Sequence, residues 1–147
     1  KYGIELVAFN GEDYYAVPGQ MKYIEQNEGK FGDIALNINI DGAGYIEGMS
    51  CFSAFELPDD FQKKLNEVIC KNPGIVEGLP WVQGDHSIFL QYGCPAIAVS
   101  SNWFIEHIAD QDITHTPKDN LSIVNYERIP ECALAISEFI HSLDQKK

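Results

Sequence analysis

Apolar runs separated by polar turns divide the chain into short segments, several of which have the length of a strand. Residues 4–10 are apolar in nearly every position, which is typical of a strand covered on both faces. Residues 34–41 and the compact run 95–100 predict two further strands, and residues 45–55 predict an extended segment at a sheet edge. Residues 101–122 predict a long loop. The predicted strands are thus well separated in sequence.

Apolar residues recur with helical spacing in four other segments. Pro18 suits the first turn of one helix, and residues 57–70 predict a second. Asp85 is placed to cap a short third helix, and residues 125–143 form a long amphipathic fourth. Strands that alternate with helices are typical of an α/β fold. We therefore predict a single domain over residues 1–147, a three-layer α/β/α sandwich with a mixed, mostly parallel sheet.

Composition and charge narrow the function. Hydrophobic residues make up 45% of the 147 residues and charged residues 22%, an ordinary balance for a globular protein. The formal net charge of -12 would repel a phosphate backbone, so we expect no nucleic-acid partner. The same charge fits either a cation site or a solvated acidic surface.

The sequence contains few features that indicate a membrane segment, a signal peptide or a redox compartment. No apolar stretch approaches the ~20 residues that span a bilayer, and the first residues contain no signal-peptide hydrophobic region. We expect no membrane partner, and the localisation is left unknown. The cysteines form no CxxC pair, so a cysteine-rich zinc site is not expected, while disulfides stay possible. They are Cys51, Cys70, Cys94 and Cys132.

Two adjacent carboxylates, Glu12 and Asp13, follow the first predicted strand. Neighbouring side chains on an extended chain point to opposite faces, so both can serve one site only if the backbone turns there. Gly11 and Pro18 make such a turn plausible. One carboxylate could then bind a metal ion while the other accepts a proton from water. The alternative is a polar junction in which Asp13 caps the following helix.

Other candidate ligands follow in loops and at strand ends. Asp41 ends the second predicted strand, where it is either a ligand or an ordinary turn residue. His115 lies in a loop, and Asp119 could accept the second ring N–H of a ligating imidazole; a solvated surface histidine is the alternative. Asp85 and His86 open a helix, as a structural cap or as part of a cleft. Oxygen and imidazole donors in this order predict a hydrolytic metal site.

Five blocks of sequence follow one another along the chain. They are Phe9-Asn10-Gly11-Glu12-Asp13, Asn39-Ile40-Asp41, Gly84-Asp85-His86-Ser87-Ile88-Phe89, Gly93-Cys94-Pro95-Ala96 and His115-Thr116-Pro117-Lys118-Asp119-Asn120-Leu121. In this order they resemble the co-catalytic zinc aminopeptidases of the leucine aminopeptidase and aminopeptidase Y type, to which glutaminyl cyclases and glutamate carboxypeptidases are related. The resemblance implies a mixed eight-stranded sheet sandwiched by helices, zinc as cofactor and a peptide as substrate.

The resemblance also implies roles for single residues. Glu12 matches the general base that deprotonates the metal-bridging water. Asp13 and His115 match ligands of one zinc ion, with Asp13 standing where the commoner pattern has Glu, and Asp41 matches a ligand of the other ion. Asp85 and His86 match a cleft segment near the substrate. The function implied is an exopeptidase, an aminopeptidase that hydrolyses N-terminal peptide bonds.

The chain departs from the family upstream. Family members carry an HxD motif and a bridging aspartate before the segment that corresponds to residues 4–9, and only a few residues precede it here. Two metal ions ~3.5–4 Å apart repel strongly without a shared anion. We therefore expect the carboxy-terminal part of a longer enzyme, without its first strands, that by itself holds at most one zinc ion weakly and is inactive.

Two other functions stay open, and the oligomeric state is unknown. The first is a metal-free relative that acts as a binding or scaffold domain, which the absent upstream ligands favour. The second is a single-zinc glutaminyl cyclase with an aromatic pocket, to which Trp81 and Trp103 could contribute. It is ranked lowest, because Ile113 and Thr114 precede His115 where those cyclases have a tryptophan next to the histidine.

Overall fold

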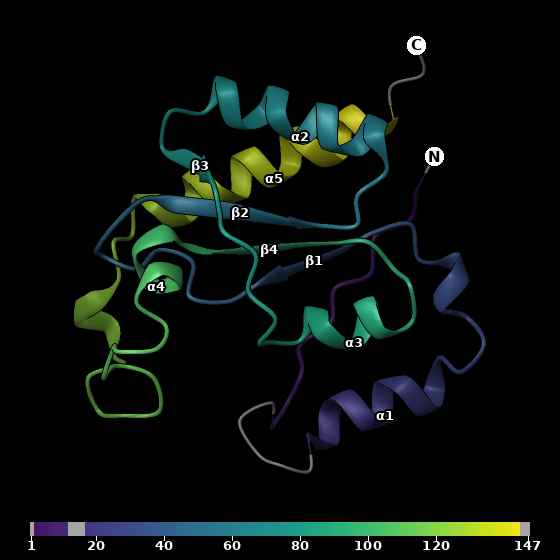
Figure 1. Cartoon of the computed structure of the whole chain (residues 1–147), viewed down its shortest axis with the longest axis horizontal. Coiled ribbons are helices and arrows are strands. Elements are labelled where there is room, and N and C mark those ends of the chain that lie inside the picture. Colours follow the sequence, from purple (N-terminus) through teal and green to yellow (C-terminus); the bar gives the residue numbers. More distant parts are fainter. Residues whose placement is uncertain (1, 12–16, 145–147) are drawn as a thin grey trace.

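A mixed β-sheet lies at the centre of the computed structural model, which describes residues 2–11 and 17–144 (Figure 1). Within these residues the sheet has four strands in the order β1-β4-β2-β3. β1 is parallel to β4 and β2 is parallel to β3, whereas β2 and β4 are antiparallel. The strands are β1 (Asn37–Ile40), β2 (Ser50–Phe55), β3 (Ile75–Glu77) and β4 (Ala96–Ser101).

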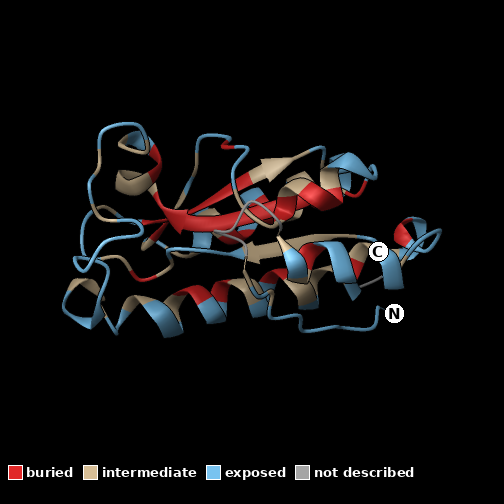
Figure 2. Ribbon diagram, turned by 90° about the horizontal axis from the view of Figure 1, so that it is seen from below, coloured by how far each residue is buried: buried red, intermediate tan, exposed pale blue. Residues whose placement is uncertain are grey.

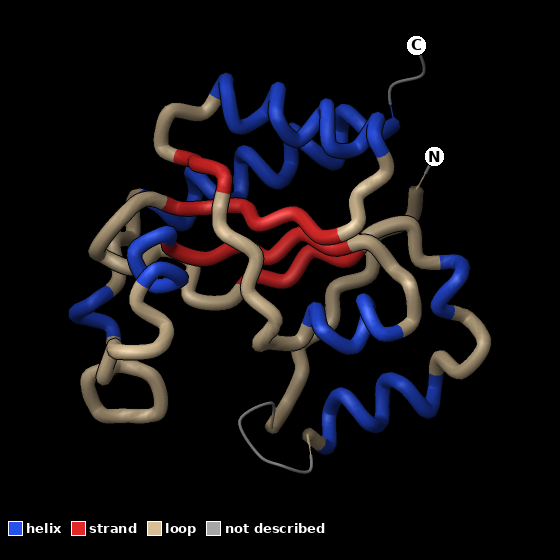
Figure 3. The backbone as a smooth tube through the Cα atoms, viewed as in Figure 1, coloured by secondary structure: helices blue, strands red, loops and turns tan. Residues whose placement is uncertain are grey.

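Helices cover both faces of the sheet. α2 and α5 lie side by side on one face, while α3 and α4 lie on the other and α1 packs outside α3 (Figures 1 and 3). The three-layer α/β/α prediction is confirmed. The helices are α1 (Pro18–Gln26), α2 (Asp59–Lys71), α3 (His86–Gln91), α4 (Asn102–Glu106) and α5 (Arg128–Asp144), with short 3-10 helices η1 (Phe31–Asp33) and η2 (Leu121–Ile123).

The alternation of side chains along the central strands produces two cores. Phe52 of β2 and Val99 of β4 point toward α2 and α5, where they meet Leu65 and Phe139. The intervening residues, such as Ala98, point to the opposite face, where they pack with Ile105 of α4. All six residues of β4 are buried, and Figure 2 shows burial concentrated on the sheet and the inward faces of the helices. β4 is therefore the strand around which both layers assemble.

The prediction of a strand at residues 4–10 is wrong. Residues 4–10 form no regular secondary structure, and the Leu6 side chain is 94% exposed. The segment runs from one helix layer to the other, with the Tyr2 ring against Phe61 and the Phe9 ring against Tyr23. A strand needs a neighbouring backbone to pair with, and no ladder of the described sheet includes this segment. An apolar run alone does not provide that neighbour.

Two further differences concern the sheet and a loop. β2 lies between β4 and β3 inside the sheet, not at its edge as predicted for residues 45–55. β3 and α4 were not predicted, because three and five residues are too short to show a period. α4 lies inside the predicted loop 101–122. The helices predicted at 57–70 and 125–143 are confirmed within a few residues.

The structure also shows the state of the cysteines and whether a described helix could cross a membrane. All four cysteines are free thiols, and burial raises the pKa of Cys51 to about 11, which makes it a poor nucleophile. Among the residues that the structure describes, none of the helices combines the length and apolar character needed to cross a bilayer.

Gly42 makes the turn that follows β1 and Asp41. Its φ is 71°, and a Cβ added there would lie 3.0 Å from the Ser100 Oγ. Because a side chain in this left-handed region costs roughly 1–2 kcal/mol, we expect Gly42→Ala to lower the free energy of unfolding by about that amount or more, measured by urea denaturation. Gly29→Ala is the matched control, since its φ is 75° with nothing within 4 Å of the added Cβ. Equal losses of unfolding free energy in Gly42→Ala and Gly29→Ala would show that the contact with Ser100 does not add to the cost of the substitution.

Candidate functional site

A cavity of about 670 Å³ opens beyond the carboxyl ends of the parallel strands β1 and β4. This is the position at which α/β sheets bind their ligands. Three of the predicted site residues line it, namely Asp41 after β1, and His115 and Asp119 from the loop before η2. The structure therefore brings together side chains from two distant parts of the chain.

Strand pairing fixes the position of Asp41. Its backbone N–H donates to the Val99 carbonyl oxygen at 3.0 Å, which extends the β1–β4 ladder by one residue. The turn at Gly42 then leads the chain away from the sheet. Asp41 is thus held by backbone on one side and by a tight turn on the other.

Hydrogen bonds within its own loop hold His115. The Gln111 Oε1 accepts from the backbone N–H groups of Ile113 at 2.7 Å and Thr114 at 3.1 Å. The Thr116 hydroxyl donates to the Ile113 carbonyl at 2.7 Å. Between them His115 has a φ of 61°, a conformation that is uncommon outside glycine and that often occurs at functional sites.

The cavity is acidic. Asp41 and Asp119 line it, and none of the described residues around it is a lysine or an arginine. Lys118 instead pairs with Asp112, and this hydrogen-bonded ion pair lowers the pKa of that carboxyl. With two carboxylates and no neighbouring cation in its lining, the cavity suits a metal ion or an amine better than an anion.

Aromatic and aliphatic side chains form much of the remaining wall, together with the polar Gln83, Gln111 and Thr114. Trp81 lies in the segment before α3, Phe104 and Ile108 lie on and after α4, and Tyr45 lies in the loop after β1. The Tyr45 loop is tied to the loop after η2, because the Asn125 N–H donates to the Gly44 carbonyl at 2.7 Å. Sequence reasoning missed Tyr45 and Phe104, since neither lies in a periodic segment; the turn at Gly44 was the available signal.

The structure does not place Asp85 and His86 in the lining of this cavity. The Asp85 carboxylate makes no capping hydrogen bond to α3, contrary to the prediction, and accepts instead from the Gln20 Nε2 at 2.6 Å. His86 is completely buried beneath the cavity wall. Burial lowers the pKa of His86, against the hydrogen bond to Trp81 and the charges of Asp41 and Asp85. Burial thus favours the neutral form of the imidazole.

The described residues do not form a complete metal site. Within residues 2–11 and 17–144, no group of three His, Cys, Asp or Glu side chains is arranged to hold a metal ion. Asp41 and His115 provide two donors of the right chemistry in one cavity. Glu12 and Asp13 lie outside the described residues, so their predicted roles stay predictions, as does the contact between Asp119 and the His115 ring.

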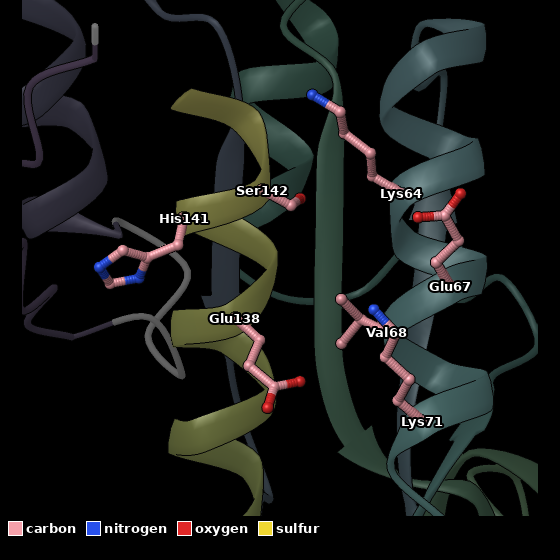
Figure 4. Close-up of a pocket in the computed structure, with 7 residues that line it drawn as sticks. All are labelled: Lys64, Glu67, Val68, Lys71, Glu138, His141 and Ser142. Atoms are coloured by element: carbon pink, nitrogen blue, oxygen red, sulfur yellow. The ribbon is translucent and has the colours of Figure 1, made fainter. Parts of the chain in front are cut away.

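A second cavity, of about 330 Å³, lies between α2 and α5 (Figure 4). Its lining mixes both signs of charge, with Lys64 and Lys71 from one helix and Glu138 from the other. None of the predicted site residues that the structure describes lines it, so we place the candidate site at the carboxyl end of the sheet.

Comparisons with known proteins agree with the α/β fold described above. The sequence matches the model of peptidase family M28 over residues 1–140. BSAP, a zinc aminopeptidase from Bacillus subtilis, has a similar structure (TM-score 0.70, 16% identity, 95% of this chain and 35% of that chain). An aminopeptidase from Aneurinibacillus sp. strain AM-1 is also similar (TM-score 0.67, 19% identity, 90% and 31%).

A third similar structure is a putative peptidase from Clostridium acetobutylicum (TM-score 0.64, 17% identity, 86% of this chain and 30% of that chain). At these identities the three likenesses concern the fold. The chain spans about a third of the length of these solved structures. No curated protein sequence gives a significant match.

Proposed function

Because the chain belongs to peptidase family M28, we propose that the complete protein is a metal-dependent aminopeptidase whose active site includes the cavity beyond β1 and β4. One observation carries this proposal: Asp41 and His115, which the family resemblance matches to zinc ligands, line the same cavity. The Asp41 backbone is held by a hydrogen bond to Val99 on β4, and the His115 loop by hydrogen bonds within the loop. The proposal concerns the complete protein, because the chain spans about a third of the length of the similar solved structures.

The proposed roles follow the chemistry of each side chain. Asp13, Asp41 and His115 are zinc ligands, and Asp119 orients the His115 ring. Zinc bound by oxygen and imidazole donors acts as a Lewis acid. Glu12 is the general base that accepts a proton from the attacking water. The described donors alone do not complete a metal site, so the proposal needs the segment around Asp13 to approach Asp41 and His115.

The choice of an aminopeptidase over a carboxypeptidase is supported by two similar solved structures, both of which are aminopeptidases. The charge of the described lining residues does not decide it, because zinc bound to Asp41 and His115 would offset the negative charge of the carboxylates.

Removal of metal tests the proposal. We expect dialysis against a chelator to abolish hydrolysis of aminoacyl-4-nitroanilides by the complete protein, and added zinc to restore it, with zinc content measured by mass spectrometry. N-acetylated substrates serve as the control and should not be cleaved, because they lack the cationic amino group. Activity that survives complete loss of the metal would contradict the proposal. A protein with neither zinc nor activity after zinc addition would instead be a binding or scaffold domain.

A further inference from the structure

His86 is fully enclosed, and both of its ring nitrogens have partners. Its Nε2 lies 2.8 Å from the Trp81 carbonyl oxygen, and its Nδ1 lies 3.2 Å from the Asn39 Nδ2. A carbonyl oxygen can only accept, so Nε2 carries the proton and Nδ1 accepts from the Asn39 amide. The neutral ring thus acts as donor and acceptor at once; the hydrogen bond to Trp81 is buried and the one to Asn39 is partly buried.

The two partners belong to different segments of the chain, each of which contributes a residue to the cavity lining. Asn39 lies on β1, two residues before Asp41, so both side chains are on the same face of the strand. Trp81 lies in the cavity wall together with Gly84. Gly84 has a φ of 110°, and an added Cβ would lie 3.2 Å from both the Asn39 Nδ2 and the Trp81 ring. His86 therefore bridges the strand that leads to Asp41 and the segment of the cavity wall that carries Trp81.

Packing alone does not require a histidine at this position. The ring is flanked by aromatic neighbours, with ring centroids 4.9 Å from both Phe55 and Trp81. An apolar side chain could fill such a space, and buried polar groups without partners are unfavourable. A histidine ring differs from an apolar side chain in that it hydrogen-bonds to both Asn39 and the Trp81 carbonyl. A buried hydrogen-bond network in which every group has a partner holds its members in one arrangement.

We propose that His86 is a positioning residue that fixes the spacing between the Asp41 strand and the Trp81 wall of the cavity. The inference rests on the proposed function, because that spacing decides how substrate lies relative to the Asp41 carboxylate. His86 does not touch the substrate, in agreement with its complete burial. It acts through Asn39 and through the Trp81 backbone.

Two substitutions separate this role from packing. His86→Leu fills the space but leaves the Asn39 amide and the Trp81 carbonyl without partners. His86→Gln retains one donor and one acceptor. In the complete protein, at a temperature where each variant is folded, we expect His86→Leu to lower kcat/KM about 10- to 100-fold, the usual effect of losing a supporting hydrogen bond. We expect His86→Gln to restore most of that loss.

A destabilised variant from the other helix layer controls for stability. Leu65→Ala removes a buried side chain of α2, far from this network, and should lower the melting temperature without changing kcat or KM of the folded enzyme. Hydrogen exchange of residues 78–85 gives a readout besides activity: it should rise in His86→Leu, and not in His86→Gln or Leu65→Ala.

The possible outcomes separate the two proposals. A wild-type protein without peptidase activity overturns the proposed function, and the exchange data then still test the bridge. Active wild-type protein with unchanged kcat and KM in His86→Leu overturns the positioning role. So does a His86→Gln variant as impaired as His86→Leu, because the effect would then follow from shape and not from hydrogen bonding.

Discussion

Replacing Glu12 by Gln is expected to lower the kcat of the complete protein by about 100- to 10,000-fold while its zinc content stays unchanged. Gln has nearly the same shape as Glu, but its amide cannot accept the proton that the attacking water must lose. A residue that acts only as a base leaves the ligand set intact when it is replaced. The measurement is steady-state hydrolysis of an aminoacyl-4-nitroanilide together with metal analysis of the same sample.

Glu5→Gln is the matched control for this substitution. Glu5 lies in the same amino-terminal segment, and its carboxylate accepts from the Tyr23 hydroxyl at 3.4 Å, away from the cavity. The same chemical change there should leave kcat unaltered. Near-normal turnover in Glu12→Gln would remove the general-base assignment. Loss of zinc together with activity would make Glu12 a ligand instead.

His115→Asn is expected to weaken zinc binding by more than the ~10- to 100-fold that loss of an outer-shell partner produces, because a direct ligand is removed. Activity should fall in parallel at limiting zinc. Asn is chosen since His115 has a φ of 61°, and Asn accepts this left-handed conformation better than most residues do. The loop should therefore keep its shape. Zinc affinity is measured by competition with a chromogenic chelator.

Asp41→Asn tests the second described donor in the same way, because the amide loses the negative charge while its size is kept. His141→Asn is the control: His141 is exposed on α5 in the opposite helix layer, and its Nδ1 lies 2.7 Å from the Ser137 carbonyl oxygen. It should bind zinc like the wild type. Unchanged affinity in either His115→Asn or Asp41→Asn would exclude that residue from the metal site.

Local patterns in the sequence predicted most of the helices and the fold class. Phe61, Leu65 and Val68 recur at helical spacing, and they are the buried face of α2. The uniform apolar run that predicts β4 matches a strand buried along its whole length. These predictions succeed because a periodic pattern reports which side of an element is covered. The strand prediction for residues 4–10 was wrong because an apolar pattern does not show whether a neighbouring strand is available for pairing.

The candidate site was predicted in part. Resemblance to a family indicated Asp41 and His115, the spacing within the loop indicated Asp119, and all three line one cavity. It also indicated Asp85 and His86 as cleft residues, whereas the Asp85 carboxylate bonds to Gln20 and the His86 ring is buried. Sequence spacing placed this pair at the start of a helix but could not show which way each side chain points.

The sequence by itself determined the longer helices and most of the strands, which residue types could serve a hydrolytic metal site, and the resemblance to zinc aminopeptidases. Only the tertiary structure decided the strand order with β2 inside the sheet, the meeting of Asp41 with the His115 loop, and the bridge from Asn39 through His86 to Trp81. The physical reason is the range of the interactions. Period and capping act between residues a few positions apart, whereas strand neighbours and cavity walls join segments that only folding brings into contact.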